Sequence, residues 1–197
     1  TGMTFASGLR AILRQDPDII SVGEIRDGET ASIAMRAAIT GHLVFSTLHT
    51  NDAISAVHRL EDIGVEPWLV SSALRGVVSQ RLVRKLCPHC KTAYRPSDDE
   101  LSLLGMAPGS DVTFYKSEGC PECRHSGYIG RRAAFEILLL NSRLRRLVSQ
   151  GADADTIFDA ARQNGFTTMQ ESCRALVLSG VTSVQEAARV INTTADA

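Results

Sequence analysis

The spacing of hydrophobic residues changes repeatedly along the first 86 residues, from a helical period to short apolar runs and back. Apolar residues at i, i+4, i+7 and i+8 predict an amphipathic helix, and an uninterrupted apolar run of four or five predicts a buried strand. The predicted elements are helix 5–13, strand 19–22, helix 27–39, strand 42–46, helix 52–63 and helix 67–82. This order of strands and helices predicts an α/β fold with a parallel sheet and right-handed crossovers.

Residues 87–130 differ in composition from the first 86 residues, because they contain four cysteines and many prolines and glycines. Regular structure is expected to be brief in this segment. The apolar run 133–140 predicts a further strand, and residues 142–193 predict a small helical bundle. The sequence therefore predicts three parts: a partial nucleotide-binding core (1–86), a small module (87–130), and a C-terminal strand with helices (131–197).

Composition excludes several classes of protein. The chain has 197 residues, 44% of them hydrophobic and 22% charged, with a formal net charge of -1. This is the profile of a soluble globular domain, and it argues against a generally basic nucleic-acid binder. No apolar run approaches the ~20 residues that span a bilayer, and no signal peptide opens the sequence. Because a helix begins almost at Thr1, we expect a fragment of a longer protein.

Glu24 follows the first predicted strand, and His49 lies in the loop after the second. Ligands of open α/β sheets bind at the carboxyl ends of the strands, where an acid can hold Mg²⁺ or water and a histidine can contact a phosphate. Arg26 is a candidate for supporting the phosphate or a neighbouring acid. The alternative is an ordinary strand-to-helix turn with capping acids. His42 and His58 are expected to have structural roles only.

Two C-x-x-C pairs, Cys87/Cys90 and Cys120/Cys123, are separated by 29 residues. A C-x-x-C turn directs both thiolates at one ion, and two such turns complete a tetrahedral zinc site with no open position, which is a structural site. Two disulfides or a redox C-x-x-C are alternatives, and His89 or His125 are possible substitute ligands. Cys173 lies among apolar residues and is expected to be a buried structural thiol.

Two longer blocks carry a family resemblance. The segments DPDIISVGEIRDGETASIAMRAA and GHLVFSTLHTNDA resemble the secretion ATPases that power type II secretion and type IV pilus assembly, and the resemblance continues through residues 79–87 and 127–131. It implies a RecA-like P-loop NTPase core that assembles as a hexamer, with Glu24 as the Walker B acid and His49 as the histidine-box residue. The tetracysteine module is typical of assembly and export members rather than of retraction motors.

The resemblance also implies cofactors, partners and a location. ATP and Mg²⁺ are expected for the full-length protein, together with an inner-membrane platform and other secretion or pilus components. The expected location is cytoplasmic, peripheral on the inner face of the cell membrane. No G-x-x-x-x-G-K-[ST] motif occurs in these residues, so the 197-residue chain alone is expected to be inactive.

Some assignments stay open in the sequence. An arginine that acts across subunits could be Arg10, Arg14 or Arg26, or one of the basic residues expected on the helix before the cysteines, which are Arg75, Arg81, Arg84 and Lys85. A zinc-ribbon nucleic-acid module and a non-catalytic interaction domain are the competing functions. The lack of aromatic residues among the basic ones disfavours nucleic acid, which is not expected as a partner.

Overall fold

The computed structural model describes the backbone of residues 2–195 and the side chains as far as residue 192. These residues form two compact units, each built from two segments of the chain. The first contains residues up to Val77 together with Ile137–Phe166, and the second contains Val78–Glu136 together with the residues from Thr167 onward. The three-part division at residues 86 and 130 describes the sequence differently and stays a prediction.

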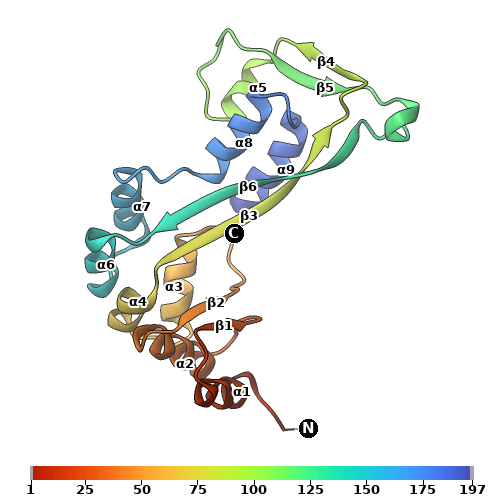
Figure 1. The fold of residues 1–197 in the computed structure, drawn as a ribbon. Helices are drawn as coiled ribbons and strands as arrows, with labels where there is room; N and C mark the ends of the chain where they lie inside the picture. The colour runs from red at the N-terminus through yellow and green to blue at the C-terminus, as the bar shows by residue number, and fades with distance from the viewer. Residues whose placement is uncertain (1, 196–197) are drawn as a thin grey trace. The chain divides into compact units, whose positions relative to one another are not determined.

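The first unit is built on a parallel pair of strands (Figure 1). β1 (Ile19–Val22) pairs with β2 (Leu43–Ser46) in the register Ile19↔Leu43 to Val22↔Ser46. The helices of this unit are α1 (Phe5–Ile12, continued by the 3-10 turn η1, Leu13–Gln15), α2 (Gly28–Ile39), α3 (Ser55–Asp62), α4 (Pro67–Ala73), α6 (Ser142–Ser149) and α7 (Ala154–Arg162). The predicted order of strands and helices through residue 63 is confirmed.

The core of the first unit lies between β1 and the helices. Its largest fully buried side chains are Leu60, Leu69, Val70, Leu138, Leu144 and Ile157. Complete burial of one such side chain stabilises the fold by roughly 1.5–3 kcal/mol. The core fixes the two strands and thus the position of the loops at their carboxyl ends.

The second unit holds a small antiparallel sheet and the remaining helices (Figure 1). β4 (Lys91–Tyr94) pairs with β5 (Phe114–Ser117), and α5 (Asp98–Leu103) lies between them in the sequence. α8 (Met169–Leu178) and α9 (Val184–Ala195) complete the unit. Its core contains Phe114, Leu101, Leu104 and Val83, all at most 1% exposed. The C-terminal helices are thus divided between the units, with α6 and α7 in the first and α8 and α9 in the second.

The predicted helix 67–82 is wrong beyond Ala73. Leu74 has extended backbone angles, and β3 (Gly76–Leu86) follows, paired with β6 (Tyr128–Leu139). Exposure alternates along β3 as in a strand. The apolar residues at 74, 77, 78 and 82 have the i, i+3, i+4 and i+8 spacing of a helix, but Val78 and Leu82 are exposed rather than buried. Gly76 comes close to β6, since a Cβ there would lie 3.1 Å from the carbonyl oxygen of Leu138.

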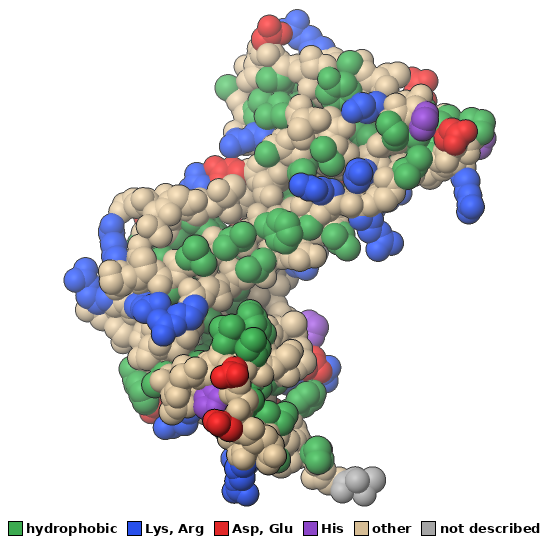
Figure 2. Space-filling model, viewed as in Figure 1, with side chains coloured by type: hydrophobic (Ala, Val, Ile, Leu, Met, Phe, Trp, Pro, Cys, Tyr) green, Lys and Arg blue, Asp and Glu red, His purple; other side chains and the backbone are tan. Residues whose placement is uncertain are grey.

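The basic residues before the cysteines are therefore not on a helix. Arg81, Arg84 and Lys85 lie on β3, and Arg75 lies immediately before it. On the face drawn in Figure 2, Lys and Arg side chains lie in several separate groups with acidic residues between some of them. Within residues 2–195, the longest helices have 12 residues, or about 18 Å at 1.5 Å per residue, and none could cross a bilayer.

Candidate functional site

Glu24 and His49 meet at the carboxyl ends of β1 and β2. The Nε2 atom of His49 lies 3.4 Å from a carboxylate oxygen of Glu24, although 25 positions separate the two residues in the sequence. The parallel pairing explains this, because strands that end in register at Val22 and Ser46 start their following loops side by side. The structure thus brings together the two residues that the sequence selected as an acid and a phosphate contact.

Arg26 joins this cluster. Its guanidinium Nη2 donates to the other carboxylate oxygen of Glu24 at 2.7 Å. The hydrogen bond from Arg26 is the main reason that the pKa of Glu24 is lowered from its ordinary value, with a smaller contribution from His49. Glu24 is therefore ionised at neutral pH, as a ligand for a cation or an acceptor for water must be.

The cluster is open to solvent on one side. The side chain of Glu24 is 23% exposed, whereas those of Arg26 and His49 are 71% and 84% exposed. Packing therefore holds Glu24 more firmly than its two partners. The position of the His49 side chain must therefore be set mainly by the backbone of the loop that carries it.

Two residues fix the ends of the histidine loop. Thr47 accepts a hydrogen bond from the Ile25 backbone N–H at 3.0 Å and donates its hydroxyl to the Gly23 carbonyl at 2.8 Å. Asp52 accepts from the backbone N–H groups of Ile54 and Ser55 at 2.8 and 2.7 Å. Asp52 thus holds the turn that precedes α3, but the N-cap position of α3 is Ile54 and has no side-chain capping hydrogen bond, so Asp52 is not the helix cap that the sequence predicts. The role of Thr47 has no signal in the sequence.

Neighbouring polar residues have structural roles. Asp27 caps α2 through the backbone N–H and hydroxyl of Thr30, at 2.8 and 2.9 Å. His42 contacts the Ala37 carbonyl through Nδ1 at 3.0 Å, and His58 lies 3.4 Å from Glu61 on α3. The structure thus agrees with the structural roles expected for both histidines.

Arg84 is committed to an ion pair within the second unit. Its guanidinium donates to Glu186 of α9 at 2.6 Å, its backbone N–H donates to the same carboxylate at 3.1 Å, and the guanidinium lies 4.2 Å from the ring centroid of Tyr128. These contacts give Arg84 a structural role, which makes it a weaker candidate for an arginine that acts across subunits.

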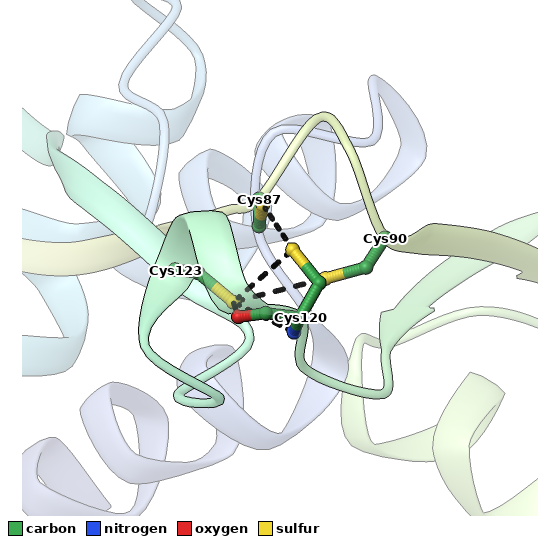
Figure 3. Close-up of side chains that lie close together, drawn as sticks. All are labelled: Cys87, Cys90, Cys120 and Cys123. Carbon is green, nitrogen blue, oxygen red and sulfur yellow. Dashed lines mark hydrogen bonds between the residues drawn. The ribbon is translucent and has the colours of Figure 1, made fainter.

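The four predicted cysteine ligands converge in the second unit (Figure 3). Cys87 and Cys90 lie in the turn between β3 and β4. Cys120 precedes the 3-10 turn η2 (Pro121–Cys123), and Cys123 is the last residue of that turn. All four Sγ atoms lie within 4.8 Å of one another. This group contains neither His89 nor His125, so neither histidine is needed as a ligand.

The sulfur separations fit a zinc ion better than a disulfide. A tetrahedral site with Zn–S bonds of about 2.3 Å has sulfurs about 3.8 Å apart, whereas a disulfide bond is about 2.05 Å long. Sγ–Sγ distances are 3.8 Å for Cys87–Cys120, 3.9 Å for Cys90–Cys123 and 3.7 Å for Cys120–Cys123, and all four cysteines are free thiols. The four residues can therefore form a metal site.

Backbone groups around Cys123 favour its thiolate form, whereas burial of Cys120 and the thiols around it raise the pKa of Cys120 to about 11. Burial opposes ionisation of Cys123, but N–H groups of Cys120 and Gly127, each 3.2 Å from its sulfur, outweigh burial and lower its pKa. Such backbone donors to the sulfur orient a ligand and stabilise its charge. By contrast, Cys173 is fully buried and burial raises its pKa to about 11, in agreement with the expected structural thiol.

Solved structures share this architecture. The crystal structure of the pilus retraction motor PilT with bound ADP matches 95% of this chain and 43% of its own, with a TM-score of 0.66 and 31% sequence identity. The ATPase DotB of Legionella pneumophila matches with a TM-score of 0.65 at 23% identity, which supports the fold alone. The protein thus has the mixed α/β fold of this class of ATPases.

Sequence relatives narrow the class to a family. The family model "Type II/IV secretion system protein" matches residues 1–189, and the chain belongs to this family. Type II secretion system protein E of Pseudomonas aeruginosa is 50% identical over 188 residues, 95% of this chain and 37% of the relative. The type IV pilus assembly ATPase PilB of Thermus thermophilus is 49% identical over 94% of this chain and 21% of the relative. The chain thus spans little more than a third, or less, of the relatives' lengths.

Proposed function

We propose that this chain is the C-terminal portion of a hexameric ATPase that powers type II protein secretion or type IV pilus assembly by ATP hydrolysis. The observation that carries the proposal is the Glu24–His49 pair at the ends of two parallel strands, in a chain that belongs to this family. α/β proteins bind nucleotides at the carboxyl edge of the sheet, which is where this pair lies. Relatives named as a type II secretion system protein and as a type IV pilus assembly ATPase support secretion or pilus assembly as the process that hydrolysis drives.

Each residue of the cluster has a role in this proposal. Glu24 carries a full negative charge and would hold Mg²⁺ or orient the attacking water. His49 would donate a hydrogen bond to the terminal phosphate, since its exposed ring can turn toward a ligand without losing buried contacts. When nucleotide binds, Arg26 would break its ion pair with Glu24 and contact phosphate oxygens instead. Bound Mg²⁺ would neutralise the charge that develops on the phosphates.

Zinc is the metal that we propose for the four cysteines. Four thiolates leave no open coordination position, so the ion would be structural and would contribute to the folding of the second unit. The Cys87 and Cys123 side chains are buried, which limits access of water to the site. A purified, reduced chain should contain a single zinc ion, as measured by elemental analysis.

The 197-residue chain alone is proposed to be inactive. It has no P-loop motif, and without backbone N–H groups and a lysine on the phosphates most of the positioning for phosphoryl transfer is missing. We further propose that the full-length protein binds an inner-membrane platform from the cytoplasmic side and does not act on nucleic acid. The separate groups of basic residues on the face in Figure 2 support the last point.

The test uses the full-length natural protein. Glu24→Gln should lower kcat for ATP hydrolysis by about 100-fold or more while nucleotide still binds, because it removes the charged acceptor and keeps the shape of the side chain. His49→Ala should lower kcat by at least about tenfold. Glu66→Gln, at an exposed acid of the first unit, is the matched control. Full turnover in the Glu24→Gln protein would exclude the proposed role of the acid.

A further inference from the structure

Thr47 connects the two halves of the proposed site. It is the first residue after β2, and it forms hydrogen bonds with the residues on both sides of Glu24. Its carbonyl accepts from the Ile25 N–H, and its hydroxyl donates to the Gly23 carbonyl. The first bond continues the ladder of the parallel strands, whereas the second needs a side-chain hydroxyl.

This bridge bears on the position of His49, because the loop that carries the histidine begins at Thr47. The imidazole is 84% exposed, so packing contributes little to its placement. The loop that carries it is fixed at one end by Thr47 and at the other by Asp52, which accepts from the Ile54 backbone N–H just before α3. If the Thr47 end loosened, the distance between His49 and Glu24 would no longer be set.

We infer that Thr47 is a positioning residue, whose hydroxyl holds the acidic turn against the histidine loop so that Glu24 and His49 face the same reacting group. The inference rests on the proposed function. Thr47 does not itself touch the reacting atoms in this arrangement. Misplacement of positioned groups by as little as about 1 Å costs large factors in rate, so a residue of this kind acts on kcat.

The experiment compares three variants of the full-length protein in steady-state ATP hydrolysis. Thr47→Val keeps the branched shape and the backbone bond but removes the hydroxyl, Thr47→Ser restores the hydroxyl, and Thr92→Val is the control at an exposed position of β4. We expect Thr47→Val to lower kcat by about three- to tenfold, the effect of one net hydrogen bond, with KM unchanged. Thr47→Ser and Thr92→Val should keep kcat within less than threefold of the wild type.

Hydrogen exchange on the same proteins gives a second readout. Peptides that cover residues 23–27 should exchange faster in Thr47→Val than in the wild type. Loss of the hydroxyl bond to the Gly23 carbonyl loosens this turn, so the remaining bond from the Ile25 amide to the Thr47 carbonyl opens more often. Peptides from the second unit should not change. Thr47→Ser should exchange like the wild type.

The results separate this inference from the proposed function. Wild-type protein without ATP turnover would overturn the function and with it the role of Thr47. An active wild type with a Thr47→Val effect below threefold, or with no faster exchange at residues 23–27, would overturn only the Thr47 inference. A raised KM at unchanged kcat would also overturn it, since that pattern means direct binding of substrate.

Discussion

Replacement of Glu186 by glutamine should destabilise the second unit. Only about 5% of the Glu186 side chain is exposed, and its carboxylate accepts hydrogen bonds from the Arg84 backbone, the Arg84 guanidinium and the Arg189 guanidinium, at 3.1, 2.6 and 3.0 Å. Glutamine has nearly the same shape and keeps one carbonyl acceptor. The substitution therefore removes the charge and replaces one acceptor oxygen by an amide NH₂, which cannot accept from the arginine donors.

The magnitude follows from the environment of the carboxylate. Burial opposes ionisation of Glu186, but the hydrogen bonds from Arg84 and Arg189 outweigh it and lower the pKa from 4.5 to about 2. A lowering of this size corresponds to roughly 3 kcal/mol of stability above pH 5. Because Arg84 is half exposed and water can solvate it in the variant, we expect a loss of about 2 kcal/mol at neutral pH.

The pH dependence has a definite sign. A carboxyl group whose pKa is lower in the folded state stabilises the fold above its ordinary pKa and loses that effect as the pH falls through the folded value. The difference between wild type and Glu186→Gln should therefore be constant from pH 7 to about 5 and shrink as the pH falls from 4.5 toward 2. Loss of metal in acid affects both proteins alike, so only their difference is compared.

The aromatic residues allow the two units to be followed separately. All three tyrosines (Tyr94, Tyr115 and Tyr128) lie in the second unit, and the single tryptophan, Trp68, lies in the first. Urea unfolding of Glu186→Gln, monitored by the near-UV circular dichroism of the tyrosines, should show the loss of stability of the second unit. Unfolding monitored by tryptophan fluorescence should show no change in the first unit.

Asp111→Asn, which removes an exposed acid from the same unit, is the control. An unchanged stability of Glu186→Gln at pH 7, or a difference that persists undiminished at pH 2, would refute the reasoning.

Three further changes test the packing and the metal site of the second unit. Gly180→Ala should lower the free energy of unfolding by about 2 kcal/mol, because Gly180 has a φ of +65° and the added Cβ would lie 2.8 Å from the Tyr115 ring. The control Gly109→Ala, at a φ of +71° with open space around the Cβ, should lower it by only about 1 kcal/mol. Urea unfolding compares the two variants. Removal of the metal by a chelator, or Cys90→Ser, should lower the urea midpoint of the tyrosine transition and leave the tryptophan transition unchanged. A tyrosine midpoint that does not change when the chelator is added would exclude a structural metal. Phe114→Ala should cost about 3–5 kcal/mol by the same assay, because Phe114 is fully buried; a loss below 1 kcal/mol would mean that this core is not tightly packed.

The errors of the sequence analysis lie where an element depends on a distant partner. The sequence predicts that the segment after Ala73 continues a helix, because its apolar residues have the spacing of a helical period. It became β3 because β6, about 50 residues later in the sequence, pairs with it. The start of β6 at Tyr128 was also missed, since its first residues are mostly exposed and give no apolar run.

The sequence by itself determined the parts of this protein that depend on local chemistry: the strands of the first unit, the capping acid Asp27, and the two cysteine turns. It also paired Glu24 with His49, because parallel strands deliver their following loops to one edge. Only the tertiary structure decided that Arg84 pairs with Glu186 across 102 positions and that Thr47 holds both neighbours of Glu24. Such contacts join segments far apart in the chain, and their geometry depends on how the whole core packs rather than on any local period.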